Sequence, residues 1–412
     1  MSEQFVIVGA GLAGAKAAES LRGQGFAGQI TLFGEEPHRP YERPPLSKGL
    51  LLGATTEEDA FVHEPGWYAD NEVQLRTGCR VESIDRAERT VTASDGSVTG
   101  YHKLLLATGS APRRLDLPGA DLDGVLYLRT LPDAVRLAAV LADAEHVVVI
   151  GAGWIGLEVA AAARSRGASV TIVETLALPL QRVLGDEVAQ VFLSLHRSRG
   201  ITFHGNSSVR EFRGGKRVTS VVLGDGSELL ADVVVAGVGI SPNIELARQA
   251  GLDTDNGITV DSGLRTSDPR IFAAGDVANA YHPLIGRQIR VEHWANAVNM
   301  GEAAAKAMMG QDVVYDQLPY FYSDQFDLGM EYSGYVAPGR YDYMVFRGDP
   351  SKYEFLAFWV DEGRVIAGMN TNIWDVQDQI QALVRAGYAG HVADLGRLAD
   401  PAIPLEDLLV GN

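Results

Sequence analysis

Cysteine is almost absent from this chain of 412 residues, in which Cys79 is the single one. One thiol cannot form an intramolecular disulfide, a CxxC redox pair or a thiolate zinc cluster. An enzyme that cycles between two of its own thiols is therefore excluded, and we expect no metal site. Cys79 stands at the start of an expected strand, apart from every motif described below, which favours a small buried or surface residue over a peroxidase thiol.

Long apolar runs and an excess of positive charge are also lacking. No apolar run reaches the ~18 residues that suggest a membrane span, and the first residues, MSEQ, lead directly into FVIVG without the features of a signal peptide. Lys and Arg number 35 against 53 Asp and Glu, which gives a net charge of −18. General binding to nucleic acid or to an anionic membrane needs a basic footprint. We therefore expect a cytoplasmic protein without membrane insertion and without a nucleic-acid partner.

Two glycine-rich motifs stand out, each between an apolar strand and an Ala-rich helical segment. The first, GAGLAG, runs from Gly9 to Gly14, and the second, GAGWIG, runs from Gly151 to Gly156. In this context the first glycine permits a tight turn, the second lets the backbone approach a pyrophosphate, and the third allows close helix–strand packing. The helix N-terminus then faces the negative charge. The sequence thus predicts two dinucleotide-binding sites.

An acidic residue follows each motif at the end of the next strand. Glu35 follows QITLF and Glu174 follows SVTIV, each roughly 20 residues after its last glycine, a spacing that suits a carboxylate accepting hydrogen bonds from an adenosine ribose. A 2′-phosphate carries about −1.5 to −2 charges and would be repelled by Glu174. The second site is therefore expected to prefer NADH over NADPH, unless a loop swings Arg182 toward the phosphate.

The segments after the two motifs repeat one order of elements. Short alternating strands with an Asp-Gly hairpin signal come first, at Asp95-Gly96 and at Asp225-Gly226. An apolar strand that ends in glycine follows in both halves. We infer a duplicated α/β architecture of two Rossmann-like dinucleotide-binding domains, each with a β-meander. From residue 319 onward the composition shifts to aromatic, alternating residues, which predicts a smaller α+β domain.

Taken together, these motifs resemble one family. VGAGLAG, RPPLSK, LLLATGS, YLRTLPDA, IGAGWIGLEVA, AGVGISPN, FAAGDVA and SDQ are similar to segments of the FAD-dependent NADH:ferredoxin reductases of the putidaredoxin reductase type, which have a glutathione-reductase-like flavoprotein fold. The resemblance spans nearly the whole chain. It implies a discontinuous FAD-binding domain (1–109 and 240–318), an NAD-binding domain (110–239) and a C-terminal α+β interface domain (319–412).

The resemblance also implies where the two nucleotides bind. FAD would lie on the first motif, with Glu35 on the ribose, Val81 near the adenine and Asp276 on the ribityl chain. The helix that starts at Trp294 would stabilise negative charge on the reduced flavin. NADH would bind Gly153, Ile155, Gly156 and Glu174, with Gly239 near its nicotinamide half. The residues implied for FAD are Gly9, Gly11, Leu12, Ala13, Gly14, Glu35, Arg43, Lys48, Val81, Ala107, Thr108, Gly109, Arg129, Gly275, Asp276, Trp294 and Tyr322.

A catalytic pair is implied by the same resemblance. In this family a lysine of RPPLSK and the glutamate of GxxGLE pair beside the flavin, which here means Lys48 and Glu158. RPPLSK is too rich in proline for regular structure before Leu46, after which we expect a short helix. The chain departs from the family at Tyr322, where relatives that serve P450 systems usually carry Trp before SDQ. Tyr keeps the aromatic plane and adds a hydroxyl.

The implied activity is hydride transfer from NADH to bound FAD, followed by transfer of single electrons to a [2Fe-2S] ferredoxin that serves a cytochrome P450 or another oxygenase. Because ferredoxins are usually acidic, we expect a local cluster of Lys and Arg at the docking face despite the net negative charge. Two alternatives stay open. One is an NADH-binding redox-sensing flavoprotein of the apoptosis-inducing-factor type, and the other is an NADH reductase of quinones or other small acceptors.

Overall fold

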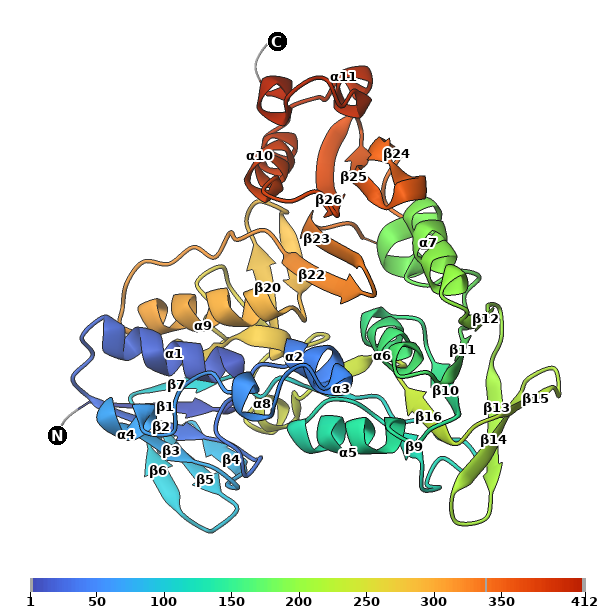
Figure 1. Ribbon diagram of the computed structural model, residues 1–412. Coiled ribbons are helices and arrows are strands. Elements are labelled where there is room, and N and C mark those ends of the chain that lie inside the picture. Colours follow the sequence, from blue (N-terminus) through green and yellow to red (C-terminus); the bar gives the residue numbers. More distant parts are fainter. Residues whose placement is uncertain (1–2, 338, 410–412) are drawn as a thin grey trace. The chain divides into compact units, whose positions relative to one another are not determined.

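The computed structural model describes residues 3–337 and 339–409 (Figure 1). The chain divides into two compact units. Each unit contains its own five-stranded parallel sheet, and unit 2 also contains a five-stranded antiparallel sheet. Unit 1 consists of Met1–Glu42, Glu58–Ala111 and Ser241–Pro319, and unit 2 consists of Arg43–Glu57, Pro112–Ile240 and Tyr320–Asn412.

The parallel sheet of unit 1 has the strand order β19-β7-β1-β2-β3. Its central strand, β1 (Gln4–Val8), is an apolar run that is buried on both faces, as parallel strands usually are. Helix α1 (Leu12–Gly23) follows β1 and packs on α9 (Trp294–Met308) so closely that a Cβ atom added to Gly301 would lie 2.5 Å from the carbonyl oxygen of Ala13. The other elements of unit 1 are β2 (Gln29–Phe33), η1 (Glu58–Ala60), α4 (Trp67–Asp70), β3 (Val73–Arg76), β4 (Val81–Asp85), β5 (Thr90–Ala93), β6 (Val98–Gly100), β7 (Lys103–Leu106), α8 (Glu245–Gln249), β18 (Ile258–Val260), β19 (Ile271–Ala273), η2 (Gly275–Val277), β20 (Ala278–His282) and β21 (Arg287–Arg290).

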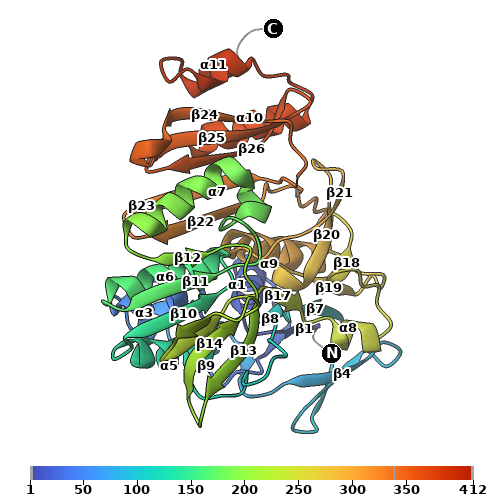
Figure 2. The same cartoon turned by 90° about the vertical axis from the view of Figure 1, so that its right-hand side faces the viewer.

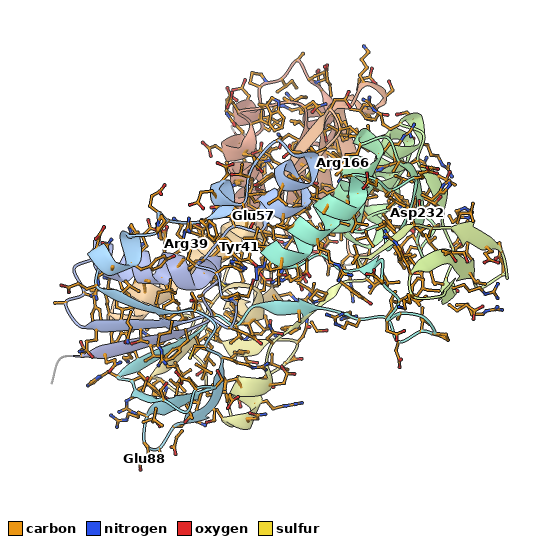
Figure 3. The ribbon with its side chains drawn as sticks, turned by 60° about the horizontal axis from the view of Figure 1, so that its bottom comes forward. Arg39, Tyr41, Glu57, Glu88, Arg166 and Asp232 are labelled. Atoms are coloured by element: carbon orange, nitrogen blue, oxygen red, sulfur yellow. The ribbon has the colours of Figure 1, made fainter. Side chains whose placement is uncertain are left out.

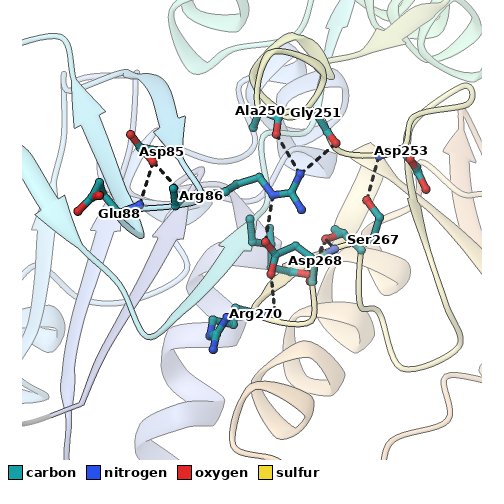
Figure 4. A network of polar contacts seen from close by, with 12 residues as sticks. Asp85, Arg86, Glu88, Ala250, Gly251, Asp253, Ser267, Asp268 and Arg270 are labelled. Carbon is teal, nitrogen blue, oxygen red and sulfur yellow. Dashed lines mark hydrogen bonds and ion pairs between the residues drawn. The ribbon is translucent and has the colours of Figure 1, made fainter.

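The β-meander of unit 1, formed by β4, β5 and β6, is tied to the segments around β18 and β19 by Arg86 (Figure 4). Arg86 Nε donates to Asp268 Oδ2 over 3.0 Å, and Nη1 donates to the carbonyl oxygens of Ala250 (3.3 Å) and Gly251 (3.2 Å). The backbone N–H of Arg270 donates to the other carboxylate oxygen of Asp268 over 3.0 Å. A largely buried carboxylate thus joins two parts of unit 1 that are distant in sequence.

Replacing Asp268 with Asn is expected to lower the free energy of unfolding by about 1–2 kcal/mol at neutral pH. Burial raises the pKa of Asp268, but the Arg270 N–H and the Arg86 guanidinium outweigh it and hold the pKa below its usual value. A carboxyl whose pKa is lowered on folding stabilises the protein above its unfolded-state pKa, and this contribution is lost as the pH falls through the folded-state pKa. In urea unfolding, the difference between wild type and variant should therefore shrink well below pH ~4. The exposed neighbour Glu88, replaced by Gln, is the control, and a difference that persists in acid would contradict the assignment.

The parallel sheet of unit 2 has the order β12-β11-β10-β16-β9, and the antiparallel sheet has the order β22-β23-β26-β25-β24. Helix α10 (Gln377–Tyr388) packs on the antiparallel sheet against β23 and β26 (Figure 2). The buried indole of Trp359, on β25, donates to the carbonyl of Leu184 in α7 over 3.2 Å. The other elements are β9 (Val125–Leu126), α5 (Leu131–Leu141), β10 (His146–Ile150), α6 (Trp154–Ser165), β11 (Ser169–Val173), α7 (Gln181–Ser198), β12 (Thr202–His204), β13 (Val209–Gly214), β14 (Val218–Leu223), β15 (Glu228–Leu230), β16 (Val233–Ala236), β22 (Tyr320–Gln325), β23 (Leu328–Gly334), β24 (Tyr343–Asp349), η3 (Pro350–Lys352), β25 (Glu354–Asp361), β26 (Arg364–Thr371), α11 (Leu395–Ala399) and η4 (Leu405–Leu408), while β8 (Ser110–Pro112) and β17 (Ile240–Pro242) span the boundaries between the units.

The RPPLSK segment and the four residues after it form two short helices, α2 (Pro44–Ser47) and α3 (Gly49–Leu52), which pack on α5 and α6 of unit 2. Regular structure begins earlier than expected, because Pro44 and Pro45 occupy the first turn of α2, where proline costs no hydrogen bond. The short helix expected after Leu46 is present as α3. Arg166, labelled in Figure 3, donates from Nε to the carbonyl oxygen of Leu51 over 2.6 Å. Lys48, at the break between the two helices, is therefore carried by a segment anchored on the helix of the second glycine motif.

The predicted fold class is confirmed by two parallel sheets, each with a small meander inserted between two of its strands in the chain, and by a C-terminal antiparallel sheet with helices. The predicted division into an FAD-binding, an NAD-binding and an interface domain assigns a ligand or a role to each domain. The fold alone does not test these assignments, so the division stays a prediction. Within residues 3–337 and 339–409, no helix is both long enough and apolar enough to cross a membrane.

Candidate functional site

The first glycine motif forms a turn in which the outer glycines are required by the chain itself. A Cβ atom on Gly9, whose φ is +116°, would lie 2.1 Å from the carbonyl oxygen of Ala107, and one on Gly14 would lie 2.0 Å from the carbonyl oxygen of Gly9. Gly11 differs, because a Cβ there would meet no heavy atom of the described residues within 4 Å. The middle glycine therefore faces open space at the start of α1.

The second glycine motif repeats this geometry in unit 2. A Cβ on Gly151 (φ +95°) would lie 2.4 Å from the carbonyl oxygen of Gly237, and one on Gly156 would lie 2.1 Å from that of Gly151. A Cβ on the middle residue, Gly153, would again meet no heavy atom of the described residues within 4 Å. Ile155, in the first turn of α6, is 38% exposed, as a residue that contacts a nucleotide would be.

Both turns fit the pyrophosphate of a dinucleotide. Gly11 and Gly153 are the N-cap residues of α1 and α6, and in the described part of the chain no side chain caps either helix. The first backbone N–H groups of both helices are thus available to an anion, and the helix dipole favours negative charge at the same place. The donor set and the space beside it fit FAD and NADH, one at each motif.

Most residues predicted for FAD gather at the carboxyl ends of the parallel strands of unit 1. The loop after β7 is fixed by Asn243, whose Nδ2 donates to Thr108 O over 2.8 Å and whose N–H donates to Gly109 O over 2.9 Å. The Thr108 hydroxyl donates back to Asn243 O over 2.8 Å. The residues that unit 1 brings to this edge are Gly9, Gly11, Leu12, Ala13, Gly14, Ala107, Thr108, Gly109, Gly275 and Asp276.

The remaining predicted FAD residues differ in position and exposure. Glu35, at the end of β2, is exposed and forms an ion pair of 3.2 Å with the exposed Arg80. Val81 is buried at the start of β4, and Trp294 is 37% exposed at the start of α9. Four of the predicted residues belong to unit 2, and their proposed proximity to FAD stays a prediction. These are Arg43, Lys48, Arg129 and Tyr322.

Glu174 is held beside the second glycine motif by backbone donors. Its Oε2 accepts from the N–H of Ala152 over 2.7 Å, and its Oε1 accepts from the N–H of Leu176 over 2.9 Å. The carboxylate is therefore fixed beside the second glycine motif, and its contact with a ribose stays a prediction. Gly239, with φ +95°, ends the turn after β16, and its carbonyl oxygen accepts from Arg113 N over 2.9 Å. Arg182 is exposed in the first turn of α7.

The structure brings the predicted catalytic pair together. Lys48 Nζ lies 2.8 Å from Glu158 Oε1, and the Glu158 side chain is only 6% exposed. Two hydroxyls also donate to this carboxylate, Ser47 to Oε2 and Ser323 to Oε1 (2.7 Å). A buried carboxylate with three donors is well satisfied, and it orients the ammonium group of Lys48.

Tyr322, the residue that departs from the family pattern, also contacts this pair. Lys48 Nζ lies 5.2 Å from the centroid of the Tyr322 ring, within the range of a cation–π interaction. Tyr322 and its neighbour Ser323 point to opposite sides of β22 because side chains alternate along a strand. One strand thus supplies an aromatic face to Lys48 and a hydroxyl to Glu158.

A row of polar side chains that sequence reasoning missed continues from Glu158. Ser323 accepts from Gln325 Nε2 over 3.1 Å, and Gln325 Oε1 lies 2.8 Å from His196 Nε2. Ser323, Gln325 and His196 are each 1% exposed. Ser47 was missed as well. The sequence carries one signal for Ser323 and Gln325. Side chains alternate along β22, so these two residues are buried on the same side as Phe321, where their polar atoms need hydrogen-bond partners.

Comparison with known proteins agrees with this arrangement. Residues 3–301 match the family model described as pyridine nucleotide-disulphide oxidoreductase, and residues 320–409 match the model described as reductase C-terminal. The chain is 41% identical, over 99% of its length and 100% of the relative, to the ferredoxin–NAD(+) reductase component of the anthranilate 1,2-dioxygenase system from Burkholderia cepacia.

Two solved structures have the same fold. The covalent complex of putidaredoxin reductase with putidaredoxin matches with a TM-score of 0.93 and 36% identity, covering 99% of this chain and 98% of that chain. The ferredoxin reductase for the CYP199A2 system from Rhodopseudomonas palustris matches with a TM-score of 0.94 and 37% identity, covering 98% of this chain and 99% of that one.

Proposed function

Because the chain belongs to the pyridine nucleotide-disulphide oxidoreductase family, we propose that it is a flavoprotein that takes hydride from NADH and passes single electrons to a [2Fe-2S] ferredoxin. The observation that carries this proposal is the pair of matching glycine turns, each with open space at its middle glycine. The disulphide half of the family name does not apply, since Cys79 is the single cysteine and is buried.

The two turns take different ligands in this proposal. FAD binds the turn of unit 1, and when bound it supplies the ability to accept two electrons as hydride and to release them one at a time. The N-terminus of α1 faces the pyrophosphate of FAD. NADH binds the turn of unit 2, where Glu174 accepts from the ribose hydroxyls and repels a 2′-phosphate.

Lys48 and Glu158 form the catalytic pair of this proposal. The positive charge of the Lys48 ammonium group would stabilise negative charge on the flavin when the flavin is electron-rich. Glu158 holds that ammonium in place through the 2.8 Å contact, and Ser47 and Ser323 hold Glu158. Tyr322 covers the ammonium from another side. The contacts with Glu158 and Tyr322 leave the ammonium group of Lys48 with little freedom to move.

The proposed electron acceptor is a ferredoxin that delivers to a cytochrome P450 or to another oxygenase. Support comes from the relatives, one of which is a component of a dioxygenase system and another of which serves the CYP199A2 system. An acidic ferredoxin needs a local group of Lys and Arg on a chain of net charge −18. We place the protein in the cytoplasm, where a chain without disulfides is expected.

The test is to mix the FAD-loaded protein with NADH in a stopped-flow instrument and then to measure cytochrome c reduction with and without a [2Fe-2S] ferredoxin. Fast flavin reduction and a rate that depends on the ferredoxin are expected. Fast flavin reduction without ferredoxin-dependent turnover would contradict the proposal and favour a redox sensor that responds to NADH by changing its assembly. Turnover with quinones alone would favour a small-acceptor reductase.

Replacing Glu174 with Gln is expected to reduce the preference for NADH over NADPH by about 10- to 100-fold, because one unit charge near the 2′-phosphate is removed. Gln keeps an oxygen that can accept from Ala152 N or Leu176 N, so the loop should stay folded. The measurement is kcat/KM for both nucleotides. Glu211, a partly exposed carboxylate on β13, is the control when replaced by Gln, and unchanged discrimination in Glu174→Gln would refute the role of Glu174.

A further inference from the structure

A continuous row of buried side chains leads from the catalytic pair to α7, and all of it lies within unit 2. Ser323 Oγ donates to Glu158 Oε1 (2.7 Å), Gln325 Nε2 donates to Ser323 Oγ (3.1 Å), and Gln325 Oε1 lies 2.8 Å from His196 Nε2. The row joins α6, β22 and α7, three elements that are distant in sequence. Nothing in the proposed reaction yet uses its far end.

The donors in this row all point the same way. Since Gln325 uses its amide nitrogen on Ser323, its carbonyl oxygen faces His196, and His196 must therefore carry its proton on Nε2. The other ring nitrogen, Nδ1, is buried and has no hydrogen-bond partner among the described residues, which suits a nitrogen that carries no proton. Burial lowers the pKa of His196 to about 4, so the ring is neutral at physiological pH.

We propose that Ser323, Gln325 and His196 are positioning residues that hold the Glu158 carboxylate against Lys48, with His196 as a fixed neutral donor at the far end. The proposal rests on the function proposed above for the Lys48–Glu158 pair. His196 donates to Gln325, Gln325 donates to Ser323, and Ser323 donates to Glu158. Hydrogen bonds aligned in this way strengthen one another, and the carboxylate at the end accepts the last one.

The row fixes the rotamer of Glu158 more firmly than the ion pair can. Lys48 and Ser323 share Oε1, whereas Ser47 occupies Oε2, so both oxygens are tied to different elements. Without Ser323, only Ser47 and Lys48 hold the carboxylate, so its rotation about the terminal bond is less restricted and Oε1 is held less firmly toward Lys48. His196 reaches this oxygen only through the other two side chains, so its effect depends on both.

The first experiment reads the His196 ring by ¹⁵N NMR in the FAD-loaded protein, with the resonance assigned by its loss in His196→Gln. A neutral ring protonated on Nε2 is expected, unchanged between about pH 6 and pH 8. A ring protonated on Nδ1, or one that titrates in this range, would overturn the proposed direction of the row. This readout does not depend on NADH, on ferredoxin or on turnover.

The second experiment compares Ser323→Ala with Ser333→Ala. Ser333 is a matched control because it is also fully buried, lies on the adjacent strand β23 and donates to Gln377 Oε1 over 2.8 Å, outside the row. In Ser323→Ala we expect flavin reduction by NADH to slow about 10-fold at saturating NADH, with the Kd for NADH unchanged. Ser333→Ala should keep the wild-type rate.

The reactivity of the Lys48 amine gives a readout besides activity. Acylation of Lys48, followed by mass spectrometry relative to the exposed Lys352, should speed up several-fold in Ser323→Ala and in Gln325→Met, and it should not change in Ser333→Ala. Equal changes in Ser323→Ala and Ser333→Ala would overturn the proposal, because the effect would then be one of general packing. If these results hold while ferredoxin-dependent turnover is absent, the row stands and the proposed acceptor is wrong.

Discussion

Replacing Lys48 with Met is expected to slow flavin reduction by NADH about 100-fold and to leave the affinity for NADH nearly unchanged. Met has a similar length but no charge. The ammonium group that it replaces lies 2.8 Å from Glu158 Oε1 and 5.2 Å from the centroid of the Tyr322 ring, so its position is set from two sides. Loss of a charge that acts mainly in the transition state lowers the rate without weakening substrate binding.

The same substitution leaves Glu158 buried without its cation. Removing one partner of a buried ion pair typically costs about 3–5 kcal/mol, although the hydroxyls of Ser47 and Ser323 still donate to the carboxylate here. The free energy of unfolding should therefore fall in Lys48→Met. In the double variant with Glu158→Gln, the buried charge is gone, and we expect most of the stability to return while hydride transfer stays slow.

Stopped-flow absorbance of the flavin measures the rate, and urea unfolding measures the stability. Lys352, an exposed lysine on the C-terminal domain, provides the control when replaced by Met. A wild-type rate in Lys48→Met would remove Lys48 from the proposed mechanism. A rate that recovers together with stability in the double variant would show that Lys48 acts through the fold alone.

Local sequence determines much of this fold. The apolar strands before Gly9 and Gly151 and the helices after them begin where expected, because the glycine spacing and the apolar runs are properties of a few neighbouring residues. The acidic residues at the ends of β2 and β11 follow from the same local rule. The carboxyl ends of parallel strands lie at one edge of a sheet, so within each unit the acidic residue lies at the same edge as the glycine motif.

The catalytic pair and its supports depend on contacts that spacing cannot show. Lys48 meets Glu158 because α2 and α3 pack on α5 and α6, and the family resemblance was the only route to that contact. The alternation of β22 indicates that Ser323 and Gln325 are buried, but it does not name their partners. His196 lies on the apolar face of α7, one turn after Phe192, where the sequence alone indicates only a core position.

The placement of the C-terminal domain also depends on contacts that the sequence pattern cannot show. Its antiparallel sheet follows from alternating aromatic residues, yet its membership of unit 2 depends on contacts such as that between Trp359 and Leu184. Leu184 precedes Gly185, whose φ of +78° bends α7 at this point. A bend of this kind depends on tertiary packing, and the helical periodicity of the segment conceals it.

Valine at the two middle glycines is expected to give opposite outcomes. Gly11→Val should fold but lose FAD, with an affinity lowered at least about 100-fold, whereas Gly153→Val should keep FAD and bind NADH at least about 100-fold more weakly. Both glycines have φ and ψ that any residue adopts, with φ of −88° at Gly11 and −79° at Gly153. Their Cβ positions contact no described residue within 4 Å, so a side chain there would enter the open space in which we propose that the pyrophosphate binds.

Gly9→Val separates this effect from misfolding. At Gly9 the φ of +116° and the 2.1 Å approach of Ala107 O should prevent the turn from forming, so this variant should lose structure as well as FAD. The ratio of flavin to protein, the circular dichroism spectrum and a titration with NADH distinguish the three variants. Loss of FAD in Gly153→Val with retention in Gly11→Val would reverse the assignment of the two turns. Because this test depends only on the space at each middle glycine, it assigns the nucleotides independently of any role for Lys48 or Glu158.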